Sequence, residues 1–490
     1  MNNAIFGLIE QTRLTARALR EFGSHLVHPT IRLGVTGLSG AGKTVFITAL
    51  VHSLVRGGRF PVFEALASGR VAGARLSPQP DDDIPRFDYE NHLRALLDER
   101  RWPESTRQIG ELRLLIEYQS QNGAMRTLTL DIVDYPGEWL LDLPLLSKNY
   151  EQWSAESLAL SRKHPRAAIA SKWHRFLKDL DPQAAEDEQA ALTAARLFTE
   201  YLQACRDRRY AMSIVPPGRF LMPGELAGSP ALTFAPLDLP ADGTAQRNSL
   251  WAMMRRRYEA YKSVVVRPFF RDHFARLDRQ IVLVDVLPAL NAGPEALHDL
   301  EGALVSILDC FRAGRKNLFS ALFRPRIDRI LFAATKADHL HRASHDRLEA
   351  VLKRMTEQAA EQAQFAGAQV DVVAIAALRA TREANIRHGR EQMNAILGVP
   401  AAGEILGGKT FDGETEAAMF PGDLPADPEA LFRGDAKAFR GLTATSAQDA
   451  DFRFLRLRPP LLRTAGGDEP ALPQIRLDRA LQFLIGDRLQ

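Results

Sequence analysis

The chain has 490 residues, of which 46% are apolar and 25% charged, with a net charge of +3, and this length corresponds to about three domain-sized units. The apolar share excludes wholesale disorder, and no apolar run approaches the roughly 18 residues of a helical membrane span. The only cysteines, Cys205 and Cys310, exclude a disulfide scaffold and a cysteine-rich zinc site.

The N-terminal segment carries no apolar signal core or small-residue cleavage site in residues 1–24, so we expect a cytoplasmic protein. Apolar residues at helical spacing predict an amphipathic helix over residues 4–22. Its apolar face is expected to pack on the protein itself, the alternative being a membrane surface.

The strongest motif of the chain follows. Residues 31–36 predict a strand, Gly37–Thr44 match the pattern G-x-x-x-x-G-K-[ST], and residues 45–54 predict a helix. Glycines let backbone N–H groups turn toward phosphate oxygens, and the helix start adds its positive dipole end. Lys43 is expected to reach the outer phosphates, and the Thr44 hydroxyl to bind Mg²⁺. The predicted nucleotide contacts of this loop are Ser39, Gly40, Ala41, Gly42, Lys43, Thr44 and Val45.

A second match to the same pattern occurs at residues 403–410. The preceding residues 398–402 are turn-like, and residues 411–414 break a helix. Because the strand and the helix are both missing from its context, we expect that this match binds no phosphate.

A D-x-x-G sequence ends the next predicted strand. Residues 128–133 alternate like a strand, and Asp134 and Gly137 follow them. Asp134 is expected to hold Mg²⁺ through water, and the Gly137 N–H to sense a γ-phosphate. Residues 112–118 predict the antiparallel partner of this strand.

Two later strand ends carry residues suited to a base. Residues 329–335 predict a buried strand that ends in Thr335, Lys336 and Asp338. A carboxylate at 338 can accept from both N1–H and N2–H₂ of guanine, which adenine cannot match. The alternative is a strand-end turn with an Asp helix cap. After a further strand at 372–375, a backbone N–H at Ala377 or Leu378 could contact the guanine O6.

The order of these motifs, with a strand at 280–287 between the second and third, resembles the Ras-like GTPase domain. That resemblance implies an α/β fold: a Ras-like P-loop core with a mixed six-stranded sheet flanked by helices, GTP or GDP as ligand, and Mg²⁺ as cofactor. A closer resemblance, over nearly the whole chain, is to the bacterial YcjX-like family of P-loop proteins. The segments that carry it are 37–44, 134–140, 217–221, 283–293 and 420–425. It implies an association with bacterial stress responses and a membrane-protein neighbour, which would place the protein in the cytoplasm or peripherally at the inner membrane.

Three positions depart from the Ras-like pattern: Glu138, Thr335, which stands where Asn is commoner, and Leu378, which stands where Lys is usual. Glu138 stands where such enzymes usually carry the glutamine that orients the attacking water. Its carboxylate could bind that water, act as a base, or turn away and pair with an arginine, so we expect slow hydrolysis near Gly137 and Glu138. The switch threonine that binds Mg²⁺ is predicted to be Thr106, with Ser105 as the next choice. Arg107, Arg219 and Arg271 are candidates for an arginine finger supplied by the chain itself.

These motifs divide the chain into four parts: residues 1–137 with the N-terminal helix and the first part of the GTP-binding domain, 138–278 as a mostly helical insertion, 279–390 as its second part, and 391–490 as a C-terminal extension. The insertion leaves directly after the D-x-x-G sequence, so nucleotide state could move it. Residues 251–280 are rich in arginine and aromatic residues. This pattern predicts an amphipathic helix with core aromatics, the alternative being a surface for anionic lipid or nucleic acid.

In the extension, residues 452–458 alternate like a strand and residues 475–489 predict a final amphipathic helix. His339 and His341 are expected to be helix caps or surface residues. The sequence thus predicts a Mg²⁺-dependent guanine-nucleotide-binding protein with slow GTP hydrolysis, a possible membrane-protein partner and no nucleic-acid partner. The alternatives are a nucleotide-gated binding module with negligible hydrolysis, and a P-loop ATPase.

Overall fold

The computed structural model of the chain describes residues 29–38, 40–79, 81–104, 108–240, 242–312, 327–365, 367–388, 391–433, 452–462 and 470–490. The helix expected at 4–22 lies outside these residues. Ser39 and Thr106, two of the predicted site residues, also lie outside them, as do Ser105 and Arg107.

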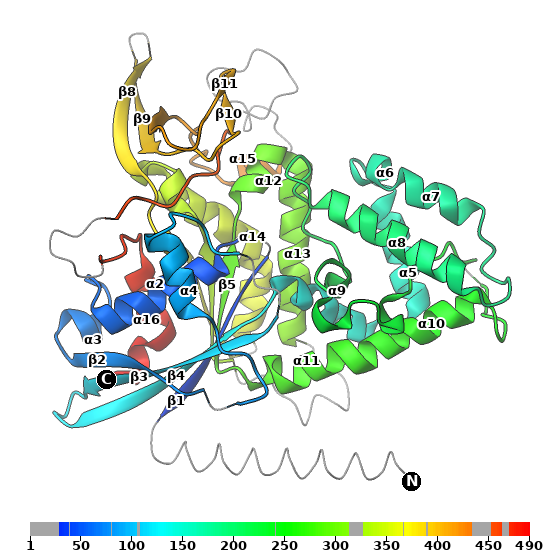
Figure 1. The fold of residues 1–490 in the computed structure, drawn as a ribbon, viewed down its shortest axis with the longest axis horizontal. Helices are drawn as coiled ribbons and strands as arrows, with labels where there is room; N and C mark the ends of the chain where they lie inside the picture. Colours follow the sequence, from blue (N-terminus) through cyan, green and yellow to red (C-terminus); the bar gives the residue numbers. More distant parts are fainter. Residues whose placement is uncertain are drawn as a thin grey trace.

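A seven-stranded sheet forms the centre of the fold (Figure 1). In sheet order the strands are β2 (Val71–Ser77), β3 (Gly110–Gln119), β4 (Met125–Asp134), β1 (Thr30–Gly37), β5 (Arg279–Val284), β6 (Arg329–Ala334) and β7 (Gln369–Ala374). The neighbouring strands from β4 through β1, β5 and β6 to β7 pair in parallel. The pairs β2–β3 and β3–β4 are antiparallel.

This architecture confirms the predicted Ras-like fold class, but the sheet has one strand more than the six that were predicted. The additional strand is β2, which pairs with β3 at the edge of the sheet. Its sequence contains Gly73 and Arg75, and its residues are half-buried or exposed. The apolar alternation by which a strand is recognised in sequence is therefore weak there.

Helices cover both faces of the sheet (Figure 1). One face packs on α2 (Lys43–Arg56), α4 (Tyr89–Leu97) and α16 (Leu477–Ile485), and the other on α13 (Pro294–Arg312) and α14 (His345–Phe365). Strand β5 contributes side chains to the hydrophobic cores on both faces of the sheet. Ile281 and Leu283 join the first core and Val282 and Val284 the second, because successive side chains of a strand point to opposite faces. The predicted final helix is confirmed by α16.

Between β4 and β5 the described chain forms helices. These are the 3₁₀ helix η1 (Gly137–Ser147), α5 (Tyr150–Ser161), α6 (Arg166–Ile169), α7 (Ser171–Lys178), α8 (Glu188–Cys205), α9 (Gly218–Leu221), α10 (Leu250–Tyr261) and α11 (Arg267–Asp272). They pack around a cluster of aromatic side chains in which the rings of Trp153 and Tyr258 stack 5.1 Å apart. This cluster is continuous with the core beneath α13 and α14.

The arginine-rich segment matches the amphipathic-helix interpretation. Trp251, Tyr258 and Tyr261 of α10 are buried. The neighbouring arginines form ion pairs with glutamates of the same insertion, namely Arg255 with Glu151, Arg256 with Glu186 and Arg257 with Glu188. These charges are therefore balanced within the insertion.

A three-stranded antiparallel sheet consists of β8 (Arg382–His388), β9 (Glu391–Gly398) and β12 (Ala417–Met419). Its first strand lies before residue 391, where the C-terminal extension is predicted to begin. The second match to the phosphate-loop pattern folds as a small hairpin of β10 (Ile405–Leu406) and β11 (Lys409–Thr410). The strand predicted at 452–458 is wrong. A single bridge between Leu457 and Pro400 is the pairing described there, and the alternating apolar side chains pack onto two cores instead of a ladder.

In the part of the chain that the structure describes, no helix is both long and apolar enough to cross a membrane.

Candidate functional site

The loop after β1 has the backbone of a phosphate cradle. Gly40 and Gly42 have φ values of 79° and 82°, a left-handed conformation that side chains with a Cβ rarely adopt. Gly42 is the N-cap of α2, which begins at Lys43. The Lys43 ammonium donates to the Gly37 carbonyl at 2.7 Å. Its two further donors and the dipole of α2 can act on an anion in the loop.

The backbone of Gly137 packs closely against the same Gly37 carbonyl group. A Cβ on Gly137 would come within 2.2 Å of this oxygen, and a Cβ on Gly37 within 2.4 Å of the Leu283 carbonyl. Both positions therefore require glycine for close backbone approach. The D-x-x-G segment is therefore in direct contact with the first residue of the phosphate loop.

Two of the three predicted magnesium residues, Thr44 and Asp134, lie at this edge of the sheet. Asp134 is buried and pairs in register with Val35, two residues before the end of β1. The Thr44 hydroxyl lies 3.4 Å from the Glu104 carbonyl, a long contact that a stronger ligand can displace. Hydroxyl and carboxylate oxygens are the ligands that Mg²⁺ uses together with substrate phosphates, so these residues fit the ion.

The carboxylate of Asp338 lies buried after β6. Its Oδ2 accepts from the Ala380 N–H at 2.8 Å, and the Thr381 hydroxyl donates to the Asp338 carbonyl oxygen at 2.5 Å. Burial raises the pKa of Asp338 to about 6, because desolvation disfavours the charged form. These bonds fix the carboxylate with acceptor capacity left for a ligand.

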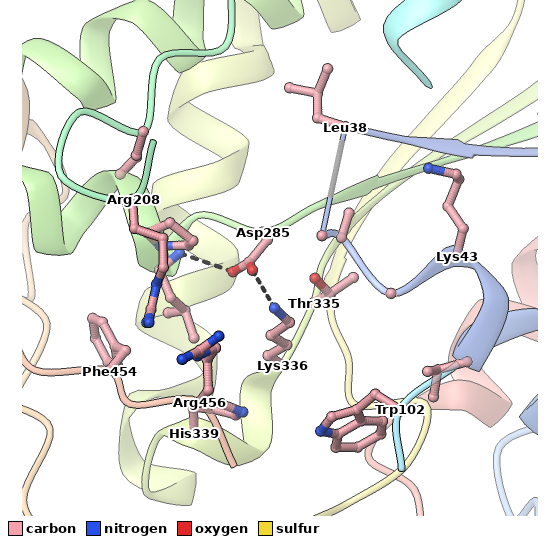
Figure 2. Close-up of a pocket in the computed structure, with 18 of the residues that line it drawn as sticks. Leu38, Lys43, Trp102, Arg208, Asp285, Thr335, Lys336, His339, Phe454 and Arg456 are labelled. Carbon is pink, nitrogen blue, oxygen red and sulfur yellow. Dashed lines mark hydrogen bonds and ion pairs between the residues drawn. The ribbon is translucent and has the colours of Figure 1, made fainter. Parts of the chain in front are cut away.

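Lys336, two residues before Asp338, has a left-handed backbone conformation with φ 60°. Its ammonium contacts the Asp285 carboxylate at 2.5 Å (Figure 2). Asp285 also accepts from the Leu287 N–H at 3.3 Å, which holds the carboxylate in place. The pair therefore fixes the Lys336 side chain across the middle of the site.

One cavity of about 680 Å³ connects the phosphate loop with the base-binding segments. Its volume is in the range of small-molecule sites. Figure 2 shows Lys43 at one side of the Asp285–Lys336 pair, and Arg208 and Phe454 at the other. The predicted residues that line it are Gly40, Ala41, Gly42, Lys43, Thr44, Val45, Glu138, Thr335, Lys336, Asp338, Ala377 and Leu378.

Glu138 is buried, with an exposed fraction of 2%. Its Oε1 accepts from Arg206 Nη2 at 3.0 Å, so it adopts the predicted alternative of pairing with an arginine. Its Oε2 has no hydrogen-bond partner among the residues that the structure describes. A buried carboxylate oxygen in that state favours an added donor.

The arginines singled out in the sequence lie elsewhere. Arg219 stacks on the Trp139 ring, 3.2 Å from its centroid, and Arg271 donates to Asp272 at 2.7 Å. Neither lines the cavity, so the structure does not bring these two candidates to the phosphate loop. Arg206 reaches the cavity from the end of α8, a helix end that no motif marks in the sequence.

Further cavity residues also went unpredicted. Asp285 had a usable signal, because it follows an apolar strand just as Asp134 does. His339 lines the cavity, so its assignment to a cap or the surface is wrong, and burial lowers its pKa to about 3. His341 is confirmed as a cap, since it accepts from the Ala343 N–H. The insertion also contributes Arg208 to the cavity lining, and the extension contributes Phe454 and Arg456.

The insertion contacts the segment after Gly137 directly. A Cβ on Gly218 would lie 2.1 Å from the Glu138 carbonyl oxygen. The Asp142 carboxylate accepts from the Gly218 N–H at 2.6 Å and from the Tyr261 hydroxyl at 2.5 Å. Movement of residues 137–142 therefore displaces α9 and α10 or breaks buried hydrogen bonds.

Known proteins are similar to this chain over most of its length. The family model described as "YcjX-like family, DUF463" matches residues 31–489. A protein named Ras-like GTPase YcjX from Escherichia coli is 38% identical over 476 residues, which cover 94% of this chain and 96% of that protein. A protein of the same name from Shewanella oneidensis is 34% identical over 499 residues, which cover 95% and 96% respectively.

Proposed function

Because the chain belongs to the YcjX-like family, we propose that it binds guanine nucleotide with Mg²⁺ and hydrolyses GTP slowly to GDP and phosphate. The nucleotide state then sets the position of the helical insertion. The observation that carries this proposal is the single cavity that contains both the phosphate loop and Asp338. The two relatives described above are named as Ras-like GTPases.

The phosphate end supplies positive charge and backbone donors. Lys43 and the loop N–H groups offset the charge of the β- and γ-phosphates. Thr44 and Asp134, together with Thr106, would hold Mg²⁺, which adds positive charge at those oxygens. At the other end Asp338 accepts from N1–H and N2–H₂ of guanine, while the Lys336 stem covers the base.

In hydrolysis a water oxygen forms a bond to the γ-phosphorus, and the bond from that phosphorus to the β–γ bridging oxygen breaks. The electron pair of the broken bond stays on GDP, and both water hydrogens leave on the phosphate as H₂PO₄⁻. Gly137 and Glu138 lie next to the loop where this water would stand. Glu138 lacks the amide N–H with which glutamine orients the attacking water, which is why we propose a slow reaction.

The presence of Glu138 in place of glutamine also favours a second function, a nucleotide-gated binding module with negligible hydrolysis. In that case the insertion and the extension dock on a partner in one nucleotide state. A role in a bacterial stress response, a cytoplasmic location and a membrane-protein partner are proposals that rest on the family resemblance. Phosphate release during single-turnover incubation with GTP separates this function from the first.

Titration of nucleotide-stripped protein with fluorescent GDP and ADP tests the base assignment, beside an Asp338→Ala variant. We expect GDP to bind at least about a hundredfold more tightly, roughly 2.7 kcal/mol, and the variant to lose that margin. Equal affinity for ADP, or a variant that behaves like the wild type, would replace this proposal with a P-loop ATPase.

A further inference from the structure

We propose that Arg206, carried by the insertion, contacts the γ-phosphate of bound GTP as an arginine finger supplied by the same chain. This inference rests on the proposed GTP site and adds a residue to it. Arg206 lines the cavity together with Gly40–Thr44 of the phosphate loop. Its contacts, its charge and its position at the end of α8 support this role.

The segment that begins at Gly137 contacts the phosphate loop. Gly137 lies against the Gly37 carbonyl, to which the Lys43 ammonium also donates. Glu138 is the next residue, and Arg206 Nη2 donates to its Oε1 at 3.0 Å. The guanidinium is therefore held one residue away from a backbone that touches the phosphate loop.

The charges of Glu138, Arg206 and the γ-phosphate favour the same arrangement. A buried carboxylate beside a γ-phosphate is repelled unless a cation accompanies it. A guanidinium has five N–H donors in a planar fork, and the bond to Glu138 uses one of them. Arg206 can therefore keep Glu138 neutralised and still offer donors to phosphate oxygens, where negative charge increases during hydrolysis.

The backbone of Arg206 is held in place by α8. Arg206 caps the C-terminal end of α8, and its N–H bonds the carbonyls of Ala204 and Gln203. Phe198, Tyr201 and Leu202 anchor this helix in the aromatic core. Its side chain is 23% exposed, so little ordering is required when the ligand arrives. A cation at a helix C-terminus is also favoured by the helix dipole.

The other cavity arginines are less suited to this role. Arg208 and Arg456 each donate to Glu404 at 2.7 Å. Figure 2 shows both beyond the Asp285–Lys336 pair, on the side away from Lys43. Among the described arginines that line the cavity, Arg206 is thus the one bonded to the segment that touches the phosphate loop.

The test compares Arg206→Ala and Arg206→Lys with the control Arg196→Ala. Arg196 lies on the same helix and pairs with Glu200 on the exposed surface. Two quantities are measured: single-turnover GTP hydrolysis, and the affinity for GDP with and without aluminium fluoride, which mimics the transferring phosphoryl group. We expect Arg206→Ala to lower hydrolysis at least a hundredfold and to abolish the gain from aluminium fluoride. GDP affinity should change less than about fivefold. Arg206→Lys should fall between wild type and Arg206→Ala, and Arg196→Ala should match wild type.

A structural role, in which Arg206 only positions Glu138, makes a different prediction. Arg206→Ala would then have no further effect in a Glu138→Gln background, and that result would overturn the proposal. An unchanged gain from aluminium fluoride in Arg206→Ala would overturn it as well. If wild type binds GDP tightly but neither hydrolyses GTP nor responds to aluminium fluoride, both the hydrolysis and the finger are wrong. If wild type hydrolyses GTP and Arg206→Ala equals it, the proposed function stands and the finger alone is wrong.

Discussion

The Cα of Gly218 packs directly against the carbonyl group of Glu138, so that a Cβ at position 218 would come within 2.1 Å of that oxygen. Gly218 belongs to the insertion, and Glu138 follows the glycine that contacts the phosphate loop. Backbone-to-backbone contact of this kind cannot relax by rotating a side chain. A shift of the segment after Gly137 is therefore passed to α9, with the Asp142 hydrogen bonds as a second link.

The first prediction concerns this contact. Gly218→Ala forces the insertion away from Glu138 and should lower the free energy of unfolding by about 1–3 kcal/mol, the usual cost of overpacking. Urea unfolding followed by tryptophan fluorescence measures it. Gly73→Ala is the matched control, because a Cβ at position 73 meets nothing within 4 Å and should change stability by less than about 0.5 kcal/mol. Equal stability of the two variants would show that the contact is loose.

The two matches to the phosphate-loop pattern provide the second prediction. Lys43→Ala should weaken GDP and GTP binding by at least about a hundredfold, because a partly buried ammonium beside the phosphates is lost. Lys409→Ala should leave affinity unchanged, since Lys409 lies on an exposed two-stranded hairpin. Fluorescent-nucleotide titration of both variants checks this. A loss with Lys409→Ala would mean that the hairpin contributes to the site.

The third prediction concerns Mg²⁺. Chelation with EDTA should weaken GDP binding to wild type by about tenfold or more, about 1.4 kcal/mol, and should have a much smaller effect on Asp134→Asn, which has lost a carboxylate. Asp82→Asn is the control, because Asp82 lies exposed in the acidic turn at 81–83, which we predict to be solvated. A full EDTA response in Asp134→Asn would remove Asp134 from the metal site.

Much of the sheet could be predicted because its strands are buried on both faces. Strands β1, β5 and β6 are almost entirely buried, and the segments that form β5 and β6 become apolar runs after their first one or two residues. Recognisable motifs begin at the end of β1, in Gly37–Thr44, and directly after β6, in Thr335–Asp338. The edge strand β2 gave no such signal, because one side of an edge strand faces solvent and tolerates Gly73 and Arg75.

The part of the site that came from short motifs could be predicted for a related reason. The phosphate loop and residues 335–338 each adopt a local backbone conformation that a few adjacent residues determine, with Gly40, Gly42 and Lys336 at positive φ. The wall formed by Arg206, Arg208 and Arg456 depends on how the insertion and the extension fold back over the sheet. Spacing along the chain carries no record of contacts between residues as distant as Arg208 and Glu404. The same limit explains why the sequence does not indicate that Arg206, unlike Arg219 and Arg271, lines the cavity.

The last prediction is a pH dependence of guanine binding that arises at Asp338. Burial raises the pKa of this carboxyl to about 6 in the ligand-free protein, and guanine requires the ionised form, which accepts two N–H donors. Binding therefore favours loss of the proton, so that affinity is constant above about pH 7 and falls about tenfold per unit below pH 6.

Between pH 7.5 and pH 5, GDP affinity should thus fall by about tenfold, about 1.4 kcal/mol, through this group alone. Isothermal titration calorimetry in buffers of different ionisation enthalpy should also detect proton release on binding at pH 5.5. The nucleotide phosphates titrate in a similar range, and the Asp338→Asn variant controls for them. Its weaker affinity should retain the phosphate contribution and lose that of the carboxyl. If wild type and Asp338→Asn show the same pH profile, Asp338 is already ionised in the free protein or does not contact the base.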